Sequence, residues 1–114
     1  MKSYTDIEQS KKLAKILPIE SADMYYWCGE DLRIGGHRAM DMDYDVPCWS
    51  LAALLKYLSE IKPQVYTQVL FPSEGKWILQ FAEYGNGNVC EVSCDNPVDA
   101  CVEMITKLHE LKIL

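Results

Sequence analysis

The sequence predicts an α+β domain, with about three helices packed on one face of a mostly antiparallel sheet. Residues 97–111 place apolar side chains at spacings of three and four, which is the pattern of an amphipathic helix. Residues 65–94 contain three strand-like runs joined by short turns, which predict an antiparallel meander. An N-terminal hairpin over residues 23–44 is expected to add further strands.

Length and composition favour one domain over residues 1–114. The chain has the commonest single-domain size, and its 49% hydrophobic content is enough for one packed core. No apolar run is long enough to cross a bilayer, and residues 1–17 lack the apolar stretch and cleavage site of a signal peptide. We therefore expect a cytoplasmic protein. Its five cysteines are odd in number and irregularly spaced, so we expect reduced thiols.

The first helix is expected to begin at Thr5. Thr5 and Glu8 have the spacing of a capping box, in which each side chain accepts a hydrogen bond from the backbone N–H of the other residue. Three lysines near the helix end complement its dipole, and Pro18 stops it. The apolar side of this helix consists of Ile7, Leu13, Ala14, Ile16 and Leu17.

The N-terminal hairpin is expected to follow this helix. Residues 23–28, DMYYWC, are rich in aromatic side chains and predict a strand. Gly29 and the pair Gly35-Gly36 break the pattern, so residues 29–36 are expected to form a loop or a wide hairpin. Residues 37–44 would then return as the second strand.

The second half of the chain contains a helix, the meander and the last helix. Residues 48–61 repeat leucine at helical spacing and predict a helix. Asn96 is a good N-cap for the last helix, Pro97 suits its first position, and Asp99 places a carboxylate in its first turn. The predicted strands of the meander cover residues 65–71, 77–84 and 89–94.

Three segments together resemble a group of small, uncharacterised bacterial proteins of the kind found in prophages and other mobile elements of gut anaerobes. These segments are residues 5–24, 47–58 and 95–111. The group has no assigned activity, so the resemblance carries no functional residue over to this chain. It implies an accessory or interaction role rather than a housekeeping enzyme.

The negative charge of the chain is unevenly distributed. The formal net charge is −6, and residues 20–45 hold seven acidic residues against Arg33 and Arg38. This balance argues against direct binding to the phosphate backbone of nucleic acid, which needs clustered Lys and Arg. The negative charge is also compatible with an acidic protein that mimics nucleic acid and occupies a DNA-binding partner.

Three aromatic residues in series indicate a surface for a partner. Tyr25, Tyr26 and Trp27 cannot all face one core if the segment is a strand, because adjacent side chains point to opposite faces. With Trp49 and Trp77 they could form an aromatic surface, or both faces of the strand could be covered. The residues expected to bind a partner are Tyr25, Trp27, Arg33, His37 and Arg38.

An alternative site is a cation centre in DMDYD. In an extended segment Asp41, Asp43 and Asp45 would share one face and could converge on Mg²⁺ or Ca²⁺, with His37 nearby. The pattern lacks the glycine and the terminal glutamate of a calcium loop. A solvated acidic edge that discourages strand pairing explains the same residues.

The other chemical signals favour structure over catalysis. Cys90, Val92 and Cys94 should share one face of a strand. A zinc site would need two more ligands, and the other cysteines form no second close pair, so we expect this face to pack against the last helix at Cys101. His109 lies near the end of the last helix, where a cation complements the dipole. We therefore expect no catalytic residues and no cofactor.

From these observations we expect a small accessory protein that binds a protein partner or associates with itself through residues 25–45. A divalent-metal-dependent enzyme that uses Asp41, Asp43 and Asp45 is the alternative. A small-molecule binding module is a third possibility, and it would need a concave apolar pocket beside the meander.

Overall fold

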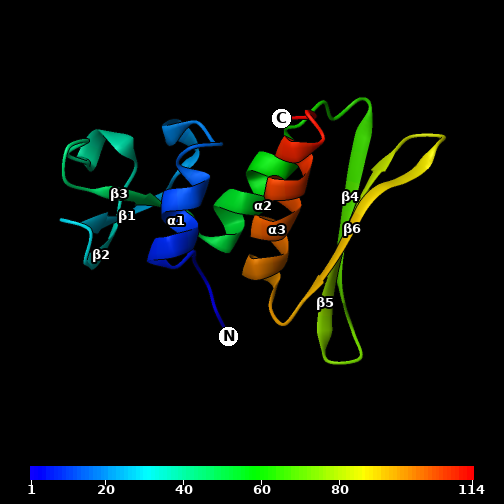
Figure 1. Ribbon diagram of the computed structural model, residues 1–114, viewed down its shortest axis with the longest axis horizontal. Coiled ribbons are helices and arrows are strands. Elements are labelled where there is room, and N and C mark those ends of the chain that lie inside the picture. The colour runs from blue at the N-terminus through cyan, green and yellow to red at the C-terminus, as the bar shows by residue number, and fades with distance from the viewer.

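The computed structural model describes residues 1–114 as three helices and two separate three-stranded antiparallel sheets, which confirms the α+β class. Figure 1 shows the helices between the two sheets. The helices are α1 (Ile7–Leu13), α2 (Leu51–Ser59) and α3 (Pro97–Glu110). The first sheet has the order β2-β1-β3 and contains β1 (Met24–Trp27), β2 (Asp31–Ile34) and β3 (Val46–Cys48). The second sheet is the meander of β4 (Tyr66–Ser73), β5 (Lys76–Glu83) and β6 (Gly87–Cys94). Two short 3-10 turns are η1 (Ile19–Ser21) and η2 (His37–Ala39).

The N-terminal hairpin is tighter than the sequence predicts. Residues 31–34, expected in a loop, form β2 and pair with β1, whereas residues 37–44, expected as a strand, contain η2 and a turn. The reason is the turn after β1, where both Cys28 (φ 51°) and Gly29 (φ 74°) are left-handed, so the chain reverses at once. A left-handed cysteine is uncommon and leaves no signal in the sequence.

The cap of α1 is displaced by one residue from the prediction. Asp6 is the N-cap: its Oδ1 accepts from the N–H of Gln9 at 2.8 Å, and Gln9 Oε1 accepts from the N–H of Asp6 at 3.1 Å. Thr5 is instead buried, where its hydroxyl shares a hydrogen bond with Ser10 and accepts one from the N–H of Trp49. Thr5 therefore joins the N-terminus to the chain before α2.

The start of α2 also differs from the prediction. The predicted helix began at Cys48, but residues 46–48 form β3 along the edge of β1, and α2 begins after Ser50. The hydroxyl of Ser50 accepts from the N–H of Ala53 at 3.1 Å and caps the helix.

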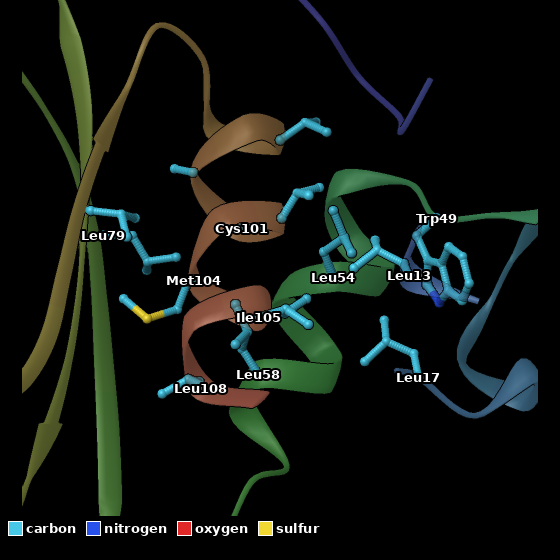
Figure 2. Packing of buried hydrophobic residues seen from close by; sticks show 14 of the residues in the cluster. Leu13, Leu17, Trp49, Leu54, Leu58, Leu79, Cys101, Met104, Ile105 and Leu108 are labelled. Atoms are coloured by element: carbon cyan, nitrogen blue, oxygen red, sulfur yellow. The ribbon is translucent and has the colours of Figure 1, made fainter. Parts of the chain in front are cut away.

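The core of the protein surrounds α3. Eight of its residues are buried, and Asn96, Pro97 and Asp99 occupy the predicted cap and first turn. Figure 2 shows Met104 on the side of the second sheet near Leu79, while Ile105 lies near Leu58 of α2. Hydrophobic burial on both sides of one helix joins the second sheet to α1 and α2.

The second sheet confirms the predicted meander. Leu79 and Phe81 of β5 are buried toward the helices. Between β4 and β5, Glu74 and Gly75 form a two-residue hairpin turn, and both have positive φ. A turn of this kind matches the right-handed twist of the two strands that it joins. No helix of the protein is both long enough and apolar enough to span a bilayer.

Candidate functional site

The outer face of the first sheet carries an exposed Trp–Arg pair. Trp27 is 47% exposed, which confirms that at least one of the three adjacent aromatic side chains points to solvent. Tyr25 pairs across the hairpin with Arg33, and Trp27 pairs with Asp31, so Trp27 and Arg33 are diagonal neighbours on one face. The guanidinium carbon of Arg33 lies 5.0 Å from the centroid of the Trp27 ring. This is a cation–π arrangement, which favours this conformation of both side chains.

Tyr26 fixes the opposite face of β1 to the body of the protein. Its side chain is buried, and its hydroxyl donates to the backbone oxygen of Thr5 at 2.7 Å. Burial raises the pKa of Tyr26 well above its ordinary value, and the neighbouring Cys48 raises it further, so the phenol stays protonated. With Tyr26 held inward, Trp27 has to point outward.

The loop after β2 packs beside Tyr25. Tyr25 is half-buried, and Gly35, with φ 153°, leaves only 3.3 Å between the position of an added Cβ and the Tyr25 ring. Ala39 of η2 lies on the same side, so a side chain at position 35 would push η2 from the ring. His37 is half-buried and Arg38 is exposed, and both belong to η2.

Trp49 and Trp77 do not extend this surface. Trp49 is fully buried, and its Nε1 donates to Ser21 Oγ at 2.9 Å. Trp77 is half-buried on β5, in the sheet at the other end of the molecule (Figure 1). A single surface with three tryptophans is therefore wrong, because Trp49 fills the space between α1 and η1 rather than facing solvent.

The carboxylates of DMDYD do not converge on a common point. The two oxygens of Asp45 accept from the N–H groups of Cys28 and Asp41, each at 2.8 Å. Asp41 Oδ1 accepts from the N–H of Asp43 at 3.0 Å. The segment is a turn rather than an extended strand, so these side chains satisfy backbone donors and hold the loop against β1. No group of three His, Cys, Asp or Glu residues in the protein is placed to hold a metal ion.

A second polar cluster joins α1 to α3, and no sequence pattern indicates it. Asp99 Oδ1 accepts from Lys2 Nζ at 2.9 Å and from Gln9 Nε2 at 2.7 Å, and its Oδ2 accepts from Asn96 Nδ2 at 2.8 Å. Burial opposes ionisation of Asp99, but these three donors outweigh it and lower its pKa. Because the partners are 90 and 97 residues apart in sequence, only the folded chain brings them together.

The thiols on the inner face of β6 are structural. Cys90, Val92 and Cys94 lie on the side of α3, as predicted, and Cys94 Sγ donates to Glu103 Oε2 at 3.0 Å. Burial and then the neighbouring Glu103 raise the pKa of Cys94 to about 12. Thiols held in this way are weak nucleophiles at neutral pH.

Comparison with protein-family models, curated proteins and solved structures finds no match to this chain. The resemblance to proteins of mobile elements therefore stays a prediction. The Trp27–Arg33 pair is exposed, consists of residue types that are common in protein interfaces, and is ordered by its own cation–π contact.

Proposed function

We propose that this protein is an accessory protein that binds a macromolecular partner through the outer face of the first sheet. The observation that carries the proposal is the exposed Trp27 ring with the Arg33 guanidinium over it. Trp and Arg are enriched at interface hot spots, and a preordered pair loses little side-chain entropy on binding.

The charge around this pair indicates the chemistry of the partner. Trp27 and Arg33 lie within the segment that holds seven acidic and two basic residues. Two copies of this acidic segment would bring like charges together across a two-fold axis, so a second copy is disfavoured. The proposed partner instead has an apolar pocket for the indole and basic residues around it.

Capture of the partner from lysate of the host, followed by binding measurements on the purified complex, tests this proposal. Trp27→Ala should weaken the complex by about 2 kcal/mol, roughly thirtyfold, if Trp27 is a hot spot. Arg33→Gln should weaken it as well, because the Trp27 ring loses the guanidinium that orders it, and added salt should slow association because the partner is basic. The matched control is Tyr84→Ala, since Tyr84 is 60% exposed but lies beyond β5 in the second sheet.

Unchanged affinity for the Trp27→Ala variant would show that the partner binds elsewhere. Equal losses for the Trp27 and Tyr84 variants would contradict the assignment of the face. Size-exclusion chromatography with light scattering on the isolated protein separates a complex with a partner from self-association.

The metal-dependent enzyme has less support. The oxygens of Asp45 and one oxygen of Asp41 bind backbone N–H groups of their own loop. Nothing in their arrangement favours a cation over these backbone donors.

A further inference from the structure

A groove with an apolar lining and a basic rim lies between the end of α1, η1 and β3. Its volume is about 540 Å³, within the range of roughly 300–1,000 Å³ that is usual for small-molecule sites. Figure 2 shows the Trp49 indole close to Leu17 in this part of the molecule. The apolar residues of the lining are Ala14, Leu17, Ile19, Met42, Val46 and Trp49.

This groove differs in chemistry from the other two cavities. Six of its ten lining residues are apolar. The larger cleft beside α3, of about 820 Å³, has two apolar residues among thirteen. The cavity between η1 and α2, of about 580 Å³, has four among ten. Only the groove at α1 therefore offers a mostly apolar surface against which a ligand could remove its own apolar area from water.

The rim of the groove has two lysines without an acidic partner in the protein. Lys11, in the last turn of α1, and Lys15, in the turn that follows it, are exposed and four residues apart. The four ion pairs of the protein use Lys2, Lys76 and Lys107 instead. Asp45 is the one acidic residue in the lining, and both its oxygens accept hydrogen bonds from backbone N–H groups.

We propose that this groove binds a small amphipathic anion, an alkyl or aryl carboxylate. Its apolar body would lie along Ile19, Met42 and Val46, which keep accessible apolar surface in the groove, and its carboxylate would contact Lys11 and Lys15. The argument for an anion is charge complementarity, since two free ammonium groups flank an apolar surface in a chain whose net charge is −6. This site is separate from the Trp27–Arg33 pair, so it goes beyond the proposed partner binding and does not depend on it.

Calorimetric titration with sodium decanoate, kept below its micelle concentration, tests the proposal. Decyltrimethylammonium has the same chain length and the opposite charge, and it serves as the control ligand. We expect saturable binding of one decanoate per chain, and affinity for the cation lower by at least about tenfold.

Three variants locate the bound decanoate. The double variant Lys11→Glu/Lys15→Glu should lower its affinity by about tenfold or more, because two attractive contacts become repulsive. The control double variant Lys12→Glu/Lys56→Glu makes the same change in net charge at exposed lysines outside the groove, and it should bind as the natural protein does. Ala14→Phe places a ring in the groove from an exposed position and should abolish binding. Circular dichroism confirms that each variant is folded.

Three results would overturn the proposal. They are the absence of saturable decanoate binding, equal binding of the cation, and equal loss in the two double variants. If decanoate does not bind while Lys11→Glu/Lys15→Glu weakens the complex with the protein partner, the groove belongs to that interface and the small-ligand proposal is wrong. The Trp27→Ala variant retains the groove, so a failure of the proposed partner face leaves decanoate binding intact.

Discussion

The two sheets of this protein contribute to different extents to its main hydrophobic core. The second sheet supplies Leu79, Phe81 and Val92 to the seventeen-residue hydrophobic core, and other half-buried residues of β4 and β6 pack against that core. The strands of the first sheet supply none of the seventeen. The first sheet is attached by the buried side chains of Tyr26, Pro47 and Cys48, which lie outside that cluster, and by polar contacts such as the Tyr26 hydroxyl to Thr5 and the Asp23 carboxylate to the N–H of Ser50.

This difference explains where function can be located. A sheet whose inner face completes the core cannot change its register or composition without loss of stability. The first sheet has a short, four-residue pairing between β1 and β2, and its outer face is free to carry an exposed Trp and Arg. The part of the molecule that contributes least to the core therefore carries the proposed partner surface and one wall of the proposed groove.

The largest expected effect comes from matched leucine truncations in the two sheets. Leu79→Ala in β5 removes a fully buried side chain and should lower the free energy of unfolding by about 2–5 kcal/mol. Leu32→Ala in β2 removes a half-buried side chain and should cost about 1 kcal/mol. Urea denaturation followed by circular dichroism measures both. If the two variants lose equal stability, the first sheet belongs to the core as fully as the second.

A smaller effect is expected from the contact that fixes the inner face of β1. Tyr26→Phe removes the hydrogen bond to the backbone oxygen of Thr5, which keeps only the weaker bond from the Cys48 thiol at 3.4 Å, and this should cost about 1 kcal/mol. Because this contact aligns β1, the variant should also speed hydrogen exchange of the amides in β1 and β2 while those of β5 keep their protection. Uniform loss of protection in both sheets would contradict the separate attachment of the first sheet.

The same difference explains which parts of the fold could be predicted. Helix α3 and the meander have local signals that agree with their packing: the cap at Asn96, the apolar stripe, and a Gly- and Asn-rich turn between β5 and β6. The first sheet depends on a left-handed Cys28 and on long-range contacts of Thr5, and neither has a local pattern. This is why the sequence patterns predict a loop where β2 lies and an N-cap at Thr5 instead of Asp6.

The site was predictable only in part for similar reasons. The exposure of an aromatic residue follows from three adjacent aromatics in one strand, so Trp27 could be anticipated. Its stacking with Arg33 depends on the register of the hairpin, which the turn at Cys28 sets. The burial of Trp49 and the capture of the Asp45 carboxylate by backbone N–H groups depend on segments distant in sequence, so composition alone could not show them.

The polar cluster between α1 and α3 should produce a modest dependence of stability on pH. The pKa of Asp99 in the folded protein lies below its ordinary value of 3.8, so the unfolded chain takes up this proton at higher pH than the folded chain does. The stabilisation is therefore present above pH 4 and is lost as the pH falls through the lower folded pKa. Asp99→Asn should lower the melting temperature at pH 7 and reduce the drop in melting temperature between pH 7 and pH 3. Asp43→Asn is the control, because Asp43 forms no ion pair.

The smallest perturbation is alkylation of the cysteines, which compares the two ends of the molecule without a mutation. Cys28, in the turn of the first sheet, is exposed, whereas Cys101 of α3 is fully buried in the core and burial raises its pKa to about 12. Iodoacetamide at pH 8 should therefore modify Cys28 first, and Cys101 only through opening of the core. Cys94 should also react slowly, because it is half-buried and its thiol donates to Glu103. Mass spectrometry of peptides over time gives the order, and modification of Cys94 or Cys101 as fast as that of Cys28 would mean that the second sheet opens as readily as the first.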